Sequence, residues 1–267
     1  MEPGVTAGVE ATPPPDVHGP LNGIPAQPRP PAPEAAPRRR SIRFPAGRLL
    51  PTPTGTPFTF AYTAVLLGTS LFMEFANPDT VAAALRASST DVTHLAQSPL
   101  LVLVASALWI AGGITSPFVI AFVVVLTALE RRIGGLRTAG VFLLGHVLAT
   151  LATEIPVGLS VMAGHLPDSS LHRLDYGISF GVAASIGALA GLLAPWPRRL
   201  VLGGFGAMLV EDLIAFTDPM TNWGHLLALA IGVATWPLVR RWRTRTRRAS
   251  APGVRSSRSA RRSATAA

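Results

Sequence analysis

The chain contains neither cysteine nor lysine, and only 14% of its 267 residues are charged. Without cysteine, disulfide bonds are excluded, and so are a thiol nucleophile and cysteine metal ligands. Soluble globular domains carry about 25% charged residues, so the low charge argues against an ordinary soluble domain. All 23 basic residues are arginines, and their placement along the chain is the first informative feature.

Apolar residues make up 49% of the chain and gather between about residues 57 and 239 in runs of roughly 20. Runs of that length can cross a hydrocarbon core about 30 Å thick. The sequence therefore predicts an all-α membrane protein with six spans. The predicted spans are about 58–75, 116–130, 137–161, 175–194, 198–217 and 223–239.

The region 98–130 allows two interpretations. The apolar run from Leu100 to Ile110 is interrupted by Gly112, Gly113 and Pro117 before a second run begins. It is either two spans or one span preceded by a membrane-embedded loop.

The arginines decide between these interpretations, because short cytoplasmic loops accumulate arginine. With six spans and a cytoplasmic N-terminus, 21 arginines fall on the cytoplasmic side and only Arg86 and Arg173 fall outside. A full span at 98–112 would disturb this alternation. We therefore expect residues 76–115 to form one external connection that dips into the interface, in a multi-pass plasma-membrane protein with both termini cytoplasmic.

The two ends of the chain differ from the apolar middle. Residues 1–53 are rich in proline and arginine and residues 241–267 in arginine, and both have too few apolar side chains to offset the entropy of ordering. They are predicted to be disordered cytoplasmic tails on a membrane domain at 54–240. Their arginines suit anionic lipid headgroups, whereas no aromatic residues are interleaved for nucleic-acid binding. No apolar segment lies near Met1, so a secretory signal peptide is not expected.

Two polar residues within the spans suggest chemistry. Residues 177–181 read G-I-S-F-G and place Ser179 where the fourth span opens, and His225 opens the sixth span. Both spans run in the same direction, so the two side chains are expected at similar depth near the external face. A serine becomes a nucleophile when a base about 2.6 to 3.2 Å away takes its proton, and histidine is the usual base. Taken singly, either residue also suits ordinary helix packing.

Small residues recur every four positions beside both side chains, which allows two helices to approach closely. They are Gly177, Gly181 and Ser185 in the fourth span, and Gly224, Ala228 and Gly232 in the sixth. If these stripes face each other, Ser179 and His225 come within hydrogen-bonding reach.

This order of features resembles that of the rhomboid intramembrane serine proteases. The shared features are six spans, a long external loop after the first, Glu-x-x-x-Gly ending the second, Gly-x-Ser opening the fourth and a small residue before His opening the sixth. The second-span motif here runs from Glu130 to Gly134, and the resemblance covers about residues 57–240. It implies a rhomboid-like six-transmembrane bundle with Ser179 as nucleophile and His225 as general base. It also implies transmembrane-helix substrates or clients, and no cofactor or metal.

Some positions depart from the family pattern. Phe180 follows the serine where rhomboids have glycine, and Ile114 and Phe118 occupy the places of a His-x-x-x-Asn motif that serves the oxyanion. Leu227 and Ala228 replace glycines after the histidine.

Other residues near the serine are candidates for supporting roles. The backbone at Gly177 and Phe180 offers oxyanion donors, because the first turn of a helix leaves its N–H groups unpaired. Asp175 is expected either to cap the fourth span or to orient His225.

Two other functions remain open. The departures fit a rhomboid-like pseudoprotease that binds transmembrane helices or lipids without cutting them. A small ion-coupled transporter would use ionisable residues in the spans, namely His146, Glu154, Glu211 and Asp212. No H-E-x-x-H motif is present, which disfavours a zinc protease.

Overall fold

The structure, a computed structural model, describes residues 49–249. Within that range the secondary structure is helical, with no strand. The predicted disorder of the tails falls mainly on residues 1–48 and 250–267, which lie outside the described residues.

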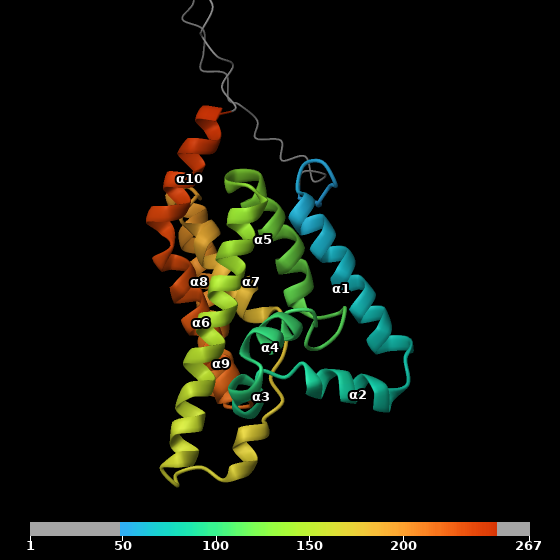
Figure 1. Cartoon of the computed structure of the whole chain (residues 1–267). Coiled ribbons are helices and arrows are strands. Elements are labelled where there is room, and N and C mark those ends of the chain that lie inside the picture. The colour runs from blue at the N-terminus through green and yellow to red at the C-terminus, as the bar shows by residue number, and fades with distance from the viewer. Residues whose placement is uncertain (1–48, 250–267) are drawn as a thin grey trace, which may run out of the picture. The chain divides into compact units, whose positions relative to one another are not determined.

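The helices follow one another with short connections (Figure 1). They are α1 (Pro57–Phe75), α2 (Pro78–Ala87), α3 (Val92–Gln97), α4 (Pro99–Ser106), α5 (Pro117–Ile133), α6 (Gly135–Met162), η2 (Asp168–His172), α7 (Ser179–Ala190), α8 (Pro195–Ala215), α9 (Pro219–Ala234) and α10 (Trp236–Ala249).

Helices α1, α5, α6, α8 and α9 coincide with predicted spans to within a few residues. By length and composition, α1 and α6 qualify as membrane spans, and α9 with α10 forms a third if that pair, bent by 48°, counts as one. The chain is thus a helical membrane protein, and the count of six spans stays a prediction.

The region 98–116 does not form a span of its own. Helix α4 has eight residues, far fewer than the roughly 20 that a crossing needs. The residues after it have irregular backbone. The carbonyls of residues 106 and 109 nevertheless accept from the N–H groups of Gly177 and Ile178. Those of residues 107 and 108 accept from the hydroxyls of Tyr62 and Thr69. Irregular backbone can be buried in this way because its polar groups are satisfied.

Helix α10 corrects the predicted domain boundary. It continues the chain as helix to Ala249, so residues 241–249 are not the disordered segment that the composition predicted. The aromatic and aliphatic side chains of its first turns explain the difference, since Val239 is fully buried and Trp242 packs beside it.

Glu130 joins α5 to the beginning of α1. Its carboxylate accepts the backbone N–H groups of Phe58 and Thr59 at 3.0 and 2.8 Å and the Thr59 hydroxyl at 2.6 Å. The first N–H groups of a helix have no partner within the helix, so this buried carboxylate caps α1 from another helix. Gly134, four residues later, has φ +89 and turns the chain from α5 into α6, which glycine does without strain.

Helix α7 is the buried centre of the bundle. Every residue from Phe180 to Ala190 is buried, and the helix packs against α5, α6 and α9. It has only 12 residues, or about 18 Å at 1.5 Å per residue, and so is shorter than the predicted span 175–194.

Small residues bring α7 and α9 into close contact. A Cβ at Gly187 would lie 2.4 Å from the Leu229 carbonyl oxygen, and one at Gly232 would lie 2.0 Å from the Ala184 carbonyl oxygen. The predicted pairing of these two helices by small residues is therefore confirmed.

The predicted face of α7 is wrong, however. Gly181 meets the Phe142 ring of α6, and the residues that face α9 are Phe180, Ala184 and Gly187. Two neighbouring rows of small residues run along α7, and only the contacts show which row meets which partner.

The C-terminal end of α7 is held by arginines. Arg198 donates to the carbonyls of residues 190 and 193, Arg240 to that of residue 191 and Arg243 to that of residue 192, at 2.8 to 3.1 Å. Cations at a helix C-terminus also interact favourably with the helix dipole. Arg198 and Arg240 lie over the Trp236 ring at 5.0 and 4.9 Å. Arginines that the sequence linked to orientation and lipid headgroups therefore bind the end of the central helix.

Replacing Gly232 by alanine should destabilise the bundle. The new methyl group would meet the α7 backbone, which cannot move aside as a side chain can, and overpacking costs about 1 to 3 kcal/mol. Thermal unfolding in detergent should show a midpoint lowered by several degrees. Gly204→Ala on α8 is the matched control, because nothing lies within 4 Å of its Cβ position. An equal midpoint for both variants would contradict the close contact.

Replacing Glu130 by glutamine should also destabilise the protein. The Phe58 and Thr59 N–H groups bond to different oxygens of the carboxylate, and in glutamine one of these positions becomes an NH2 group that cannot accept. An unsatisfied buried donor costs about 1 to 3 kcal/mol. The same unfolding assay measures the loss, with Glu74→Gln at the exposed end of α1 as control. Equal stability of the two variants would show that Glu130 does not cap α1.

Candidate active site

A cavity of about 430 Å³ lies at the N-terminal end of α7 and is lined by both Ser179 and His225. Its walls also come from residues 116–118 at the start of α5, from the chain preceding α7, and from His146 and Thr150 of α6. The tertiary structure thus brings the two predicted site residues to one cavity, although 46 positions separate them in sequence.

Ser179 is the first residue of α7 and is half-buried. Its hydroxyl has no hydrogen-bond partner among the described residues, and the N–H groups of Ser179, Phe180 and Gly181 likewise find no acceptor there. A helix N-terminus with free N–H groups carries a partial positive charge. This end of α7 is therefore suited to stabilise an oxyanion beside the serine.

The Gly177 N–H is not one of these donors. It donates to the Ser106 carbonyl at 2.9 Å, and the next N–H, of Ile178, donates to the Trp109 carbonyl at 3.2 Å. The expectation that Gly177 supplies an oxyanion donor is wrong for this reason, while the Phe180 N–H remains available.

His225 lies between two aromatic rings. It stacks on Phe118 with ring centroids 5.2 Å apart and planes at 17°, and it meets the edge of Phe180 at 5.2 Å and 75°. The residue is 7% exposed, and neither ring nitrogen has a hydrogen-bond partner within the described part of the chain. Thus no hydrogen bond joins His225 to Ser179 in this structure.

The face that α7 turns to α9 explains this arrangement. Phe180 stands on that face, and its ring occupies the space above Gly224, where a Cβ would lie 2.4 Å from the ring. Successive residues of a helix point about 100° apart, so Ser179 points to one side of the α9 contact. The residue that meets the histidine helix is therefore Phe180.

Asp175 does not cap α7 or orient His225. The N-cap position belongs to Ile178 and has no side-chain cap. The Asp175 carboxylate instead accepts from the Thr90 hydroxyl at 3.1 Å and lies 3.8 Å from Arg173. The Thr90 contact ties the chain before Ser179 to the segment between α2 and α3.

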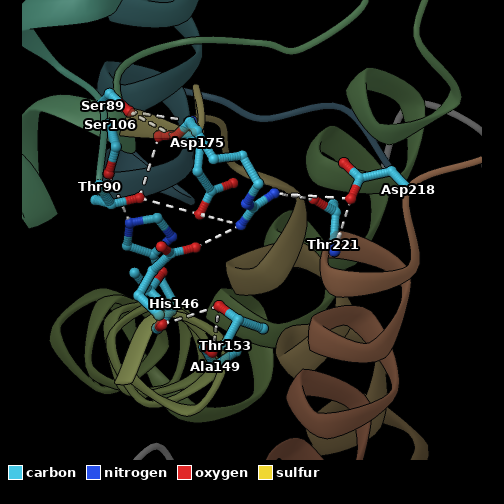
Figure 2. Close-up of polar contacts among 12 residues, drawn as sticks. Ser89, Thr90, Ser106, His146, Ala149, Thr153, Asp175, Asp218 and Thr221 are labelled. Atoms are coloured by element: carbon cyan, nitrogen blue, oxygen red, sulfur yellow. Dashed lines mark hydrogen bonds and ion pairs between the residues drawn. The ribbon is translucent and has the colours of Figure 1, made fainter. Parts of the chain in front are cut away.

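Arg173 lies at the centre of a polar cluster beside the cavity. Arg173 itself is not part of the cavity lining, but its partners Asp175, Asp218 and Thr221 are. It forms an ion pair with Glu154 of α6, lies 3.7 Å from Asp218 and donates to Thr221 Oγ1 at 3.1 Å. Figure 2 shows Asp175 on one side of this cluster and Asp218 with Thr221 on the other. Burial lowers the pKa of the Arg173 guanidinium, but Asp175 and Glu154 outweigh this effect and raise it above its ordinary value, so Arg173 remains charged.

In the sequence, Arg173 is recognisable only as a marker of topology. The sequence held one indication of an ion pair. Arg173 is one of only two arginines assigned to the outside, and Glu154 is an acid within a predicted span. A buried acid usually has a partner of opposite charge, but the sequence did not show which arginine reaches it.

The four ionisable residues proposed for a transporter do not converge. His146 bonds through Nε2 to Ser106 and to the Leu103 carbonyl, at 3.0 and 3.1 Å, whereas Glu154 pairs with the arginine. Glu211 and Asp212 are exposed near the end of α8. Within residues 49–249, no three acidic or histidine side chains form a cluster able to hold a metal ion.

The fold and this site define a helical membrane protein with a serine and a histidine at one cavity. The profile of the rhomboid-like protein family matches residues 54–245, which is most of the chain. The chain therefore belongs to the rhomboid-like protein family. No curated protein and no solved structure matches it significantly.

Proposed function

We propose that the chain is a rhomboid-type intramembrane serine protease that cleaves membrane-spanning substrates near the external face. It would cross the plasma membrane six times with both termini cytoplasmic. The main support is the cavity shared by Ser179 and His225, beside N–H groups at the start of α7 that have no acceptor in the described part of the chain.

In this proposal, His225 takes the proton of Ser179 as Oγ attacks the scissile carbonyl carbon. The oxyanion that forms accepts hydrogen bonds from N–H groups of the first turn of α7. When the C–N bond breaks, the amine leaves with the proton held by His225, and water then hydrolyses the acyl ester with His225 again as base. The first step requires a side-chain movement, because serine and histidine are not bonded in the structure.

A second candidate is a pseudoprotease that binds transmembrane helices or lipids. The aromatic contacts of His225 favour it, because Phe118 and Phe180 occupy places where the family pattern has polar residues or glycine. A histidine held between two rings, with both nitrogens unpaired, is not poised to take a proton.

A fluorophosphonate probe tests the protease assignment directly. The full chain in detergent should become covalently labelled, and Ser179→Ala should abolish labelling because the probe reacts with an activated serine. His225→Ala should slow labelling by about a hundredfold or more, the usual contribution of a general base.

Two other serines control this assay. Ser160→Ala, near the end of α6, should label like the unmodified chain. Ser116 also lines the cavity, so loss of labelling in Ser116→Ala but not in Ser179→Ala would refute the proposed nucleophile. Failure of the unmodified chain to label would support the pseudoprotease.

Phe180→Gly separates the two candidates further. Removing the ring frees one side of His225, so the labelling rate of a protease should rise, by about tenfold or more if the base becomes correctly placed. Loss of a buried ring also destabilises the fold by about 3 to 5 kcal/mol, but destabilisation alone would lower the rate. Phe72→Ala, which removes a ring on α1, is the control. A Phe180→Gly chain that folds and stays unlabelled would favour the pseudoprotease.

A further inference from the structure

Arg173 is placed where it can control the geometry of the candidate site without lining the cavity. It lies in the connection between η2 and α7, and its side chain is 24% exposed. Its partners belong to three parts of the chain: α6, the segment that leads to Ser179, and the first turn of α9, which leads to His225.

Two of these contacts lie close in sequence to the site residues. Asp175 stands four residues before Ser179, and Thr221 stands four residues before His225, which is about one helical turn. Arg173 Nη2 lies 3.8 Å from Asp175 Oδ2, and Nη1 donates to Thr221 Oγ1 at 3.1 Å. One guanidinium therefore contacts the chain leading to the serine and the helix that carries the histidine.

The third contact fixes the guanidinium itself. Glu154 is 1% exposed, its Oε1 pairs with Arg173 Nη2, and its Oε2 has no other partner in the described range. Glu154 belongs to α6, which packs against both α7 and α9. A planar guanidinium has donors in a fixed arrangement, so anchoring one edge determines where the remaining donors lie.

The charges of the cluster suit a role in fixing the arrangement of the chain segments better than a role in stabilising the fold. The free energy lost when two charges leave water offsets most of the attraction within a buried ion pair, so such a pair adds little net stability. In some proteins these pairs serve to select one arrangement of the chain. Here three carboxylates, those of Glu154, Asp175 and Asp218, lie within 4.0 Å of one arginine. Loss of Arg173 would leave them close together with no cation among them.

We propose that Arg173 is a positioning residue that sets the place of the Ser179 segment relative to the His225 helix. This inference rests on the proposed function for its effect on chemistry, but its geometric part does not.

The geometric part is tested by electron paramagnetic resonance on the full chain. Because the chain has no cysteine, Leu174→Cys and Trp223→Cys, both exposed, carry two nitroxide labels without background. The parent should give one narrow distance distribution. Arg173→Ala should broaden or shift it, and Arg173→Lys, which keeps the charge but not the forked donors, should give an intermediate result. Arg86→Ala removes the other external arginine, which is exposed, and should leave the distribution unchanged.

The chemical part uses the fluorophosphonate labelling rate in the same variants without the spin labels. Arg173→Ala should lower the rate about 10- to 100-fold, since a misplacement near 1 Å costs up to about a hundredfold. Added guanidinium chloride should restore part of the rate, whereas equal sodium chloride should not. A fold simply weakened by the mutation would gain nothing from guanidinium, which is a denaturant.

The outcomes separate the two proposals. An unchanged distance distribution in Arg173→Ala, or an equal change in Arg86→Ala, would overturn the positioning role. A changed distribution with an unchanged labelling rate would overturn its link to the site. If the unmodified chain does not react with the probe, the protease proposal fails, and the distance measurements still decide whether Arg173 positions the two segments.

Discussion

The close contact between α7 and α9 is the constraint on which the rest of the bundle depends. Gly187 and Gly232 allow each helix to meet the backbone of the other, at distances where any side chain would collide. Such an approach leaves no room for rotation, because protein interiors are densely packed. The orientation of α7 about its axis is therefore fixed by a few glycines, which have no side chain at the contact.

That orientation determines the character of the candidate site. Phe180 lies on the face toward α9 and meets His225, while Ser179 lies to one side, its hydroxyl without a partner among residues 49–249. The two residues line one cavity without a hydrogen bond between them. The same packing that brings serine and histidine together thus also places an aromatic ring against the histidine.

Both ends of the short α7 depend on chain segments distant in sequence. At its C-terminal end, the last carbonyls accept hydrogen bonds from Arg198, Arg240 and Arg243. Before its N-terminal end, the last residue of α4 and the segment after it accept hydrogen bonds from the N–H groups of residues 177 and 178, and Arg173 connects the same chain to α6 and α9. A helix too short to cross a bilayer can be buried here because other parts of the chain satisfy its polar ends.

The sequence by itself determined the helical membrane class, the approximate limits of α1, α5, α6, α8 and α9, and the family, because apolar runs, arginine positions and motif order are local or additive features. It also identified Ser179 and His225 as residues of interest. Only the tertiary structure decided that α7 turns Phe180 toward α9, that Gly177 is already hydrogen-bonded, that residues 241–249 are helical and that Arg173 pairs with Glu154. Each of these depends on which side chains meet across the bundle, and a pattern along one helix cannot specify its partner's face.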